Sequence, residues 1–278
     1  MLTTPDLIFA IALPLLLAAG LFAFRHKWVA PVALGVGLAL SVFGTNGWPG
    51  FPPVDAIQWL GFLAIVWMIV GVIDSLRPWP TIARLAIAIL VALVTVWLIS
   101  ANQRPNWSSS ESILWIGGFT LAIFGLTIST DRLLARTTPG ISALQLALLA
   151  IATAMVIAMT GSQSLANRAG TLAVVLIIAF VWSRRSQLGR GTAIVFVPLW
   201  AAILIAHWLY AASESSPLIS FLLLTITPPL CWFGQIPAIQ RRSRWTKWAI
   251  QLSLVIVPLA VAVILVAIPF ARAIREFE

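Results

Sequence analysis

The stretch TIARLAIAILVALVTVWLIS, residues 81 to 100, is apolar along almost its whole length, and its one charged side chain, Arg84, lies near its start. About 20 apolar residues in a helix cross the ~30 Å hydrocarbon core of a bilayer. The stretch therefore predicts a transmembrane helix. Comparable apolar stretches follow one another along the chain, separated by short segments rich in Gly, Pro, Ser and charged residues, so the same prediction applies to most of the sequence.

Composition also indicates a membrane protein. Of the 278 residues, 61% are hydrophobic and 9% are charged, whereas about a quarter of the residues in a soluble domain are charged. We predict an all-α, polytopic transmembrane helical bundle of about ten spans, which forms a single transmembrane domain over residues 1–278 and leaves no room for a sizeable soluble domain. The predicted spans are 5–24, 28–44, 57–76, 82–100, 112–128, 142–160, 170–182, 192–211, 217–234 and 246–271.

The basic residues are concentrated in every second connection between these spans. The positive-inside rule makes that side cytoplasmic, and ten spans then place both termini outside. The basic residues of this inner side are Arg25, Lys27, Arg77, Arg84, Arg132, Arg136, Arg184, Arg185, Arg190, Arg241, Arg242, Arg244 and Lys247. The outer side has only Arg104, Arg168, Arg272 and Arg275. The formal net charge of +9 thus reflects membrane topology, and no nucleic-acid partner is expected.

Tryptophan gives a second indication of the membrane boundaries. All of the 14 tryptophans except Trp67 and Trp200 fall near a predicted inner or outer boundary. The indole ring is apolar with one polar group and prefers the level of the lipid headgroups. Two aromatic belts are typical of a membrane-spanning bundle.

Ionisable residues deep in a membrane mark proton relays, ion pathways or catalytic sites. Here every Asp, Glu, Lys and Arg is expected in a connection or within about one turn of a helix end. Asp74, the deepest acid, is expected to form a boundary ion pair with Arg77 at i+3, the alternative being a functional carboxylate. Cys231 has no cysteine partner, and no ligand motif for a metal or a nucleotide is recognisable. No cofactor is expected, and an enzyme is disfavoured.

The ninth span contains TITPPLCWFG, residues 225 to 234, in which two adjacent prolines interrupt the apolar run. Pro228 and Pro229 remove two backbone donors and disfavour the helical conformation at Thr227. Transporters often bind their substrate where a span unwinds. The candidate substrate or helix-break site consists of Thr227, Pro228, Pro229 and His207. A packing kink and a hydrogen-bonded histidine near the membrane boundary are the plainer interpretations.

The predicted outer loop NGWPGFPPVDAIQW, residues 46 to 59, contains no Lys or Arg. Its prolines restrict the turn, and Asp55 is placed to cap the following helix. The loop is interpreted as a stiff lid over the bundle, as an outer docking surface for a partner, or as a small-molecule site. The residues of the docking surface are Trp48, Phe51, Pro52, Pro53 and Asp55.

The segment QRRSRWTKW, residues 240 to 248, is the most basic of the predicted inner connections. Its cations are Arg241, Arg242, Arg244 and Lys247. Basic residues next to a membrane attract anionic lipid headgroups. We expect contact with anionic lipids at the cytoplasmic face or with an acidic cytoplasmic partner, although membrane orientation alone would also explain the cluster.

The segments WSSSESIL (107–114) and ASESSPLI (212–219) each place an acid among serines just before a span. A helix cap with an acid at the positive end of the helix dipole explains both. The alternative is a weak internal repeat that relates residues 28–130 to residues 142–240, because repeated helical units are common in transporters.

With its GWPGFPP loop and the segment MTGSQSLANRAGTLA (159–173), the chain resembles uncharacterised bacterial multi-pass membrane proteins. The resemblance implies a bacterial inner (cytoplasmic) membrane location and no particular activity. The first functional hypothesis is a non-catalytic scaffold or accessory subunit of a membrane complex, supported by the expected lack of buried charge. Its partners would be other membrane-protein subunits and the lipid bilayer. The alternative is a transporter or flippase for an apolar or amphipathic solute, and the third is a membrane enzyme acting on lipid, based on His207, Glu111 and Glu214 lying toward one face.

Overall fold

The computed structural model describes residues 8–24, 26–77, 79–182, 188–210 and 218–276, and this part of the chain is helical, with no strand. Within it, nine helices are long and apolar enough to cross a membrane, and a shorter apolar helix covers Ile8–Phe22. The chain is therefore a multi-pass membrane protein. The elements are η1 (Ile8–Ala12), α2 (Leu13–Phe22), α3 (Val29–Asn46), α4 (Ala56–Leu76), α5 (Thr81–Ile99), η2 (Arg104–Asn106), α6 (Ser109–Arg136), α7 (Pro139–Met159), α8 (Gln163–Val181), α9 (Gly191–Tyr210), α10 (Leu218–Leu230), η3 (Cys231–Gln235), α11 (Pro237–Gln240) and α12 (Arg244–Glu276).

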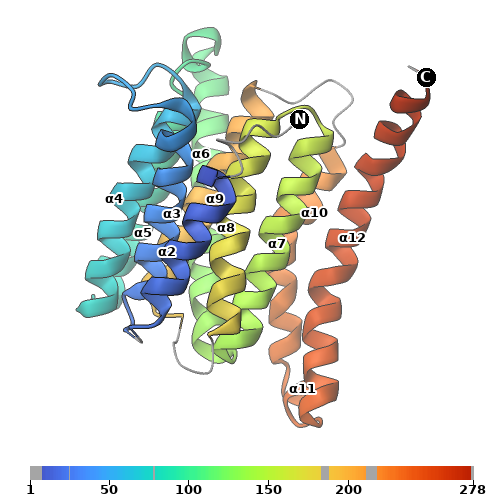
Figure 1. The fold of residues 1–278 in the computed structure, drawn as a ribbon. Helices are drawn as coiled ribbons and strands as arrows, with labels where there is room; N and C mark the ends of the chain where they lie inside the picture. Colours follow the sequence, from blue (N-terminus) through green and yellow to red (C-terminus); the bar gives the residue numbers. More distant parts are fainter. Residues whose placement is uncertain (1–7, 25, 78, 183–187, 211–217, 277–278) are drawn as a thin grey trace.

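The start of the described chain and the end of α12 lie toward the same end of the bundle (Figure 1). An even number of crossings requires this arrangement. The total of ten spans, the side on which the termini lie and the internal repeat stay predictions. Three residues of the topology argument, Arg25, Arg184 and Arg185, lie outside the described residues. So do Glu214 of the enzyme hypothesis and the predicted cap in ASESSPLI.

The predicted spans match the helices closely, with two exceptions. The fifth was predicted over residues 112–128, but α6 continues to Arg136, so Asp131 lies inside this helix rather than in an inner connection. The seventh was predicted over residues 170–182, but α8 already begins at Gln163. The side chain of Ser162 accepts a hydrogen bond from the backbone N–H of Leu165 and caps the new helix start. The polar composition of this first part of α8 is typical of a connection between spans, yet the segment is helical. As a result Arg168 lies inside α8 rather than in an outer loop.

Helix α9 forms the centre of the bundle. Every residue from Gly191 to His207 is buried, and α9 contacts α3, α4, α5, α6, α7 and α8. Two glycines allow the closest of these approaches, because a Cβ atom at Gly191 would lie 1.9 Å from the carbonyl oxygen of Gly71 on α4. Small residues let transmembrane helices approach in this way. The contact brings the end of α4 next to the start of α9, where the candidate site lies.

The two tryptophans outside the predicted belts have buried hydrogen-bond partners. The indole Nε1 of Trp67 on α4 donates to Oγ1 of Thr95 on α5 at 3.1 Å. The indole Nε1 of Trp200 on α9 donates to Oγ1 of Thr153 on α7 at 2.8 Å. A buried indole N–H needs such an acceptor, so these rings join helices rather than anchor the protein at a boundary.

Helix α12 lies at the edge of the bundle, where it packs mainly against α7 and α10 (Figure 1). Polar contacts fix both of these packings. The hydroxyl of Ser220 on α10 donates to the carbonyl oxygen of Ala262 at 3.0 Å, and Nε2 of Gln145 on α7 donates to the carbonyl oxygen of Gln251 at 3.1 Å.

Candidate functional site

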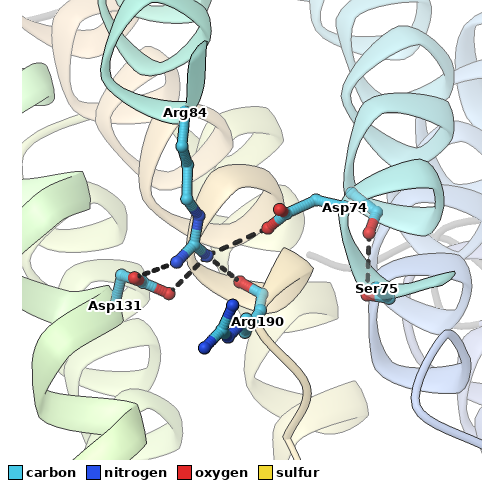
Figure 2. Close-up of polar contacts among 6 residues, drawn as sticks. Asp74, Ser75, Arg84, Asp131 and Arg190 are labelled. Atoms are coloured by element: carbon cyan, nitrogen blue, oxygen red, sulfur yellow. Dashed lines mark hydrogen bonds and ion pairs between the residues drawn. The ribbon is translucent and has the colours of Figure 1, made fainter. Parts of the chain in front are cut away.

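An arginine joins four parts of the bundle at the predicted inner end (Figure 2). Nη2 of Arg84 on α5 donates to Oδ2 of Asp74 on α4 at 2.9 Å and to the carbonyl oxygen of Arg190, just before α9, at 3.0 Å. Both terminal nitrogens also bond Asp131 on α6, Nη1 to Oδ2 at 2.5 Å and Nη2 to Oδ1 at 2.7 Å. The guanidinium thus makes a bidentate pair with one carboxylate and a single contact with the other. We call Asp74, Arg84 and Asp131 the inner ion network.

The network is largely removed from water. The side chain of Asp74 is fully buried, and those of Arg84 and Asp131 are 16% and 17% exposed. The second carboxylate oxygen of Asp74, Oδ1, is buried and accepts no hydrogen bond from any described residue. Buried carboxylate oxygens are normally hydrogen-bonded, because an unsatisfied one retains its full desolvation penalty. Oδ1 of Asp74 is thus a buried acceptor in the network that lacks a hydrogen-bond donor among the described residues.

Two expectations about charge were wrong. Asp74 does not pair with Arg77, because Arg77 ends α4 with an extended backbone (φ −130°, ψ 96°) and its side chain is exposed. An i+3 pair requires both residues to be helical. Charge is also not confined to the helix ends and connections, since Arg168 lies inside α8 and is only 2% exposed. Asp74 lies near the end of α4, as expected, but it is buried. The expected lack of buried charge, which supported the scaffold hypothesis, is therefore not observed.

A cavity of about 570 Å³ lies beside the network. Its polar lining includes Asp74, Ser75, Lys27 and Arg190, and the loop residues Leu188 and Gly189 form part of its wall. The hydroxyl of Ser75 donates to the carbonyl oxygen of Gly71 at 2.7 Å and so faces its own helix (Figure 2). A smaller cavity of about 160 Å³, lined by Arg84, Asp131 and Arg132 among others, shares the same loop wall. The larger cavity has the size of a small-molecule site and contains both signs of charge.

Arg168 forms a second buried polar cluster, at the predicted outer end. Its Nη1 donates to the carbonyl oxygen and hydroxyl of Ser41 at 2.6 and 2.8 Å, and its Nη2 donates to the hydroxyl of Thr45. Both acceptor residues lie in the last turns of α3, where the free carbonyls and the helix dipole favour a cation. Arg168 and Thr171 are spaced i and i+3 and both contact Ser41, so helical spacing was the signal in the sequence that could have revealed this cluster.

The candidate substrate site in the ninth span is tightly packed. Thr227 and Pro228 line a cavity of only about 10 Å³, which is too small for a solute. α10 continues through both prolines as far as Leu230 and then tightens into the 3₁₀ turn η3. Pro229 thus lies within the last turn of α10 instead of breaking it at Thr227. The cavity beside Thr227 and Pro228 therefore leaves no room for a solute.

His207 lies elsewhere and is fully buried. Its Nε2 is hydrogen-bonded to the hydroxyl of Thr160 at 2.8 Å, and its ring stacks on Phe221 with centroids 5.5 Å apart. The structure therefore does not bring His207 together with the Pro228 segment. Glu111, the described outer acid of the enzyme hypothesis, instead forms a capping box with Ser108. The predicted cap in WSSSESIL is confirmed, and the membrane-enzyme hypothesis gains no support.

The predicted outer loop, residues 46 to 59, caps helix α4 and also holds exposed aromatic side chains. Asp55 caps α4 by accepting hydrogen bonds from the N–H groups of Ile57 and Gln58, as predicted. Trp48 and Phe51 remain 73% and 79% exposed. They belong to an aromatic cluster whose members are Phe43, Trp48, Phe51, Trp59 and Phe62. Pro53 is buried beneath them, while Pro52 is exposed.

A further cavity is almost purely apolar. It has a volume of about 280 Å³ and lies between α6, α9 and α10. Its aromatic lining consists of Trp115, Phe119, Trp200, Trp208 and Phe221. We call it the apolar groove. Such walls suit a hydrocarbon chain rather than a charged group.

Comparisons of this chain with protein-family models, with curated proteins and with solved structures found no match. The functional argument therefore depends on the geometry. Within the described part of the chain, no group of three or more His, Cys, Asp and Glu side chains is arranged to hold a metal ion.

Proposed function

We propose that the protein is a transporter for an amphipathic solute and that the inner ion network is the polar part of its binding site. The observation that carries the proposal is the buried, unbonded Oδ1 of Asp74, a residue that also lines the 570 Å³ cavity. Ionisable residues within a membrane bundle mark substrate or ion pathways by default. The scaffold hypothesis has lost one of its supports, the expected lack of buried charge.

A purely structural ion network would satisfy all of its carboxylate oxygens. Leaving one buried acceptor without a donor costs about 1–3 kcal/mol, and more for a charged group. An ammonium group or another N–H donor that enters the cavity would satisfy Oδ1 of Asp74 without breaking its pair with Arg84. This chemistry favours a solute with a cationic or hydrogen-bond-donating head.

The apolar groove supports an amphipathic rather than a fully polar solute. It opens beside α6 and α9, the helices that also contribute Asp131 and Arg190 at the other end of the bundle. Leu126 in the groove and Asp131 in the network are separated by about 7.5 Å along α6, at 1.5 Å per residue. The proposed tail site and the proposed head site are thus both lined in part by α6.

The test is a charge-movement recording on proteoliposomes adsorbed to a solid-supported membrane, with a series of alkylammonium ions of increasing chain length. We expect a transient current with the wild-type protein, because an alkylammonium ion carries both a donor head and an apolar tail. Asp74→Asn should abolish it, since the amide carries no charge. Asp55→Asn, at the exposed cap of α4, is the matched control and should leave the current unchanged. Equal currents from the wild type and Asp74→Asn would refute the proposal.

A scaffold or accessory subunit is the second candidate, and the exposed Trp48 and Phe51 favour it. Large apolar rings held outside the bundle are typical of a partner interface. Extraction in a mild detergent followed by native mass spectrometry should then recover a stoichiometric partner from the wild type. The variant Trp48→Ser with Phe51→Ser should lose that partner, and a chain that remains alone in several mild detergents would contradict the scaffold.

A further inference from the structure

A separate cavity of about 650 Å³ lies at the inner ends of three helices. α7 contributes its first residues, α8 its last turn and α12 its first turns. The lining residues are Thr138, Pro139, Gly140, Phe180, Val181, Arg244, Lys247 and Trp248. The inner ion network does not contribute to this cavity, and only Pro139 also lines the cavity beside Asp74.

The charged side chains of this cavity are all basic. Arg244 is exposed and Lys247 is half-buried, and the described lining contains no acid. The two acids of the inner end, Asp74 and Asp131, are both paired with Arg84. Arg244 and Lys247 therefore face the cavity without a carboxylate partner among the described residues. Their charge is complementary to an anion.

The backbone adds to this positive potential. Thr138 precedes α7 without capping it through its side chain, so the N–H groups of the first turn have no side-chain acceptor there. Gly140, in that first turn, lines the cavity. The N-terminus of a helix as long as α7 carries a partial positive charge and suits a phosphate group.

The remaining walls point to a lipid rather than to a soluble anion. Phe180, Val181 and Trp248 are apolar, and Val181 is 65% exposed on the outer surface of α8. Next to the cavity, Trp245 is 80% exposed and its ring lies against Trp248 with centroids 6.4 Å apart. Arg244 lies over the ring of Trp248 at 5.3 Å, so cationic and apolar surfaces meet within one helical turn. Indole rings of this kind are typical of the headgroup level of a membrane.

From this combination we infer that the cavity is a binding site for one anionic phospholipid. The phosphate lies between Arg244, Lys247 and the first turn of α7, and the acyl chains run along Phe180 and Val181 toward the bilayer core. This lipid is a bound structural ligand and not the transported solute, so the inference holds whether or not Asp74 binds a substrate.

The test is native mass spectrometry of the detergent-solubilised protein, titrated with dioleoylphosphatidylglycerol or with dioleoylphosphatidylcholine, which has the same chains. We expect wild-type protein to retain one phosphatidylglycerol more tightly than phosphatidylcholine. The double variant Arg244→Gln, Lys247→Gln should bind phosphatidylglycerol about thirtyfold more weakly, from the attraction per basic residue near an anionic headgroup. The matched control Arg241→Gln, Arg242→Gln removes the same charge from exposed residues outside the cavity and should lose much less affinity than the cavity variant, because these side chains do not line the site.

Three results would overturn the inference: equal losses in the two double variants, equal wild-type affinity for the two lipids, or displacement of phosphatidylglycerol by millimolar inorganic phosphate. A second measurement does not depend on the charge variants. Phosphatidylglycerol brominated on its acyl chains should quench the fluorescence of Trp248, taken as the difference between the wild type and Trp248→Phe, more strongly than brominated phosphatidylcholine. Equal quenching by the two lipids would also overturn it.

Discussion

Arg84 determines the energetics of the inner ion network. Its guanidinium is the only described partner of the Asp74 carboxylate and also binds both oxygens of Asp131. Pairing offsets the desolvation of these carboxylates, but a buried ion pair adds little net stability over an apolar contact. Removing one partner of such a pair costs much more stability, because the charge that remains is buried and unpaired. Net stabilisation by the ion pairs thus does not by itself explain the network.

The first prediction concerns Arg84→Gln. The substitution removes the ion-pair partner of Asp74 and Asp131 and should lower the free energy of unfolding by roughly 3–5 kcal/mol, measured by SDS titration in mixed micelles. Adding Asp74→Asn to Arg84→Gln should recover part of this loss, because one of the two unpaired charges is then gone. Arg77→Gln, at the same end of the bundle but exposed, should leave the unfolding free energy unchanged. Equal stability of Arg84→Gln and the wild type would show that the observed ion pairs do not govern this end of the bundle.

At the scale of elements, the position of α9 depends on the contact between Gly71 and Gly191. A Cβ atom at Gly191 would meet the carbonyl oxygen of Gly71 at 1.9 Å and the hydroxyl of Ser75 at 2.6 Å. Backbone atoms cannot yield as the end of a side chain can, so α4 and α9 would have to separate. The carbonyl of Arg190, next in the chain, would then move away from Arg84. Helix packing and the ion network are coupled at this point.

Gly191→Ala should therefore destabilise the protein by about 3 kcal/mol, as expected for overpacking in a close-packed interior. The matched control is Gly117→Ala on α6, where an added Cβ meets no atom within 4 Å. There the better helix propensity of alanine should be neutral or stabilising by up to about 1 kcal/mol. Thermal unfolding of the two variants in the same detergent measures the difference. Similar midpoints would mean that α4 and α9 tolerate a wider spacing than the structure indicates.

Element boundaries were largely predictable because lipid imposes a length and an apolar composition on each span. The start of α8 was predicted wrongly for the same reason, because Gln163, Asn167 and Arg168 look like a connection only if polar residues must face water. In the structure Arg168 finds its acceptors in the last turns of α3. Similarly, the sequence placed Trp67 and Trp200 away from both predicted membrane boundaries. Their hydrogen-bond acceptors, Thr95 and Thr153, could be found only in the folded structure.

For the whole molecule, the candidate site was the part that sequence reasoning missed. Asp74 and Arg84 are close in the chain, but Asp131 and the carbonyl of Arg190 reach them only through the packing of α6 and α9 around α5. Neither periodicity nor composition specifies such tertiary neighbours. In contrast, the prolines of the ninth span were conspicuous in the sequence, and the chain packs tightly around Pro228. The prolines of the ninth span indicated only the local course of the helix, whereas the largely buried charges of Asp74, Arg84 and Asp131 identify the candidate site.

The positive-inside rule predicts the sidedness of the whole molecule, and single cysteines can test it. Cys231 is the one native cysteine and is buried, so Cys231→Ala provides a background without a reactive thiol. Gly50→Cys probes the outer loop, and Ser243→Cys probes the turn before α12; both positions are exposed. Helices α4 to α10 lie between these positions, and if each crosses the membrane the number of crossings is odd. The two cysteines must then lie on opposite faces.

We expect a membrane-impermeant maleimide to label Gly50→Cys in intact cells and Ser243→Cys only after permeabilisation. The physical reason is that the basic side chains around Ser243 resist transfer across the membrane, whereas the loop around Gly50 carries none. The reverse pattern would place the inner ion network and the proposed phospholipid site at the external face. Labelling of both positions in intact cells would instead mean that one of the intervening helices does not cross. The crossing by α10 depends on the η3 turn, because the apolar span Leu218–Gln235 includes both elements.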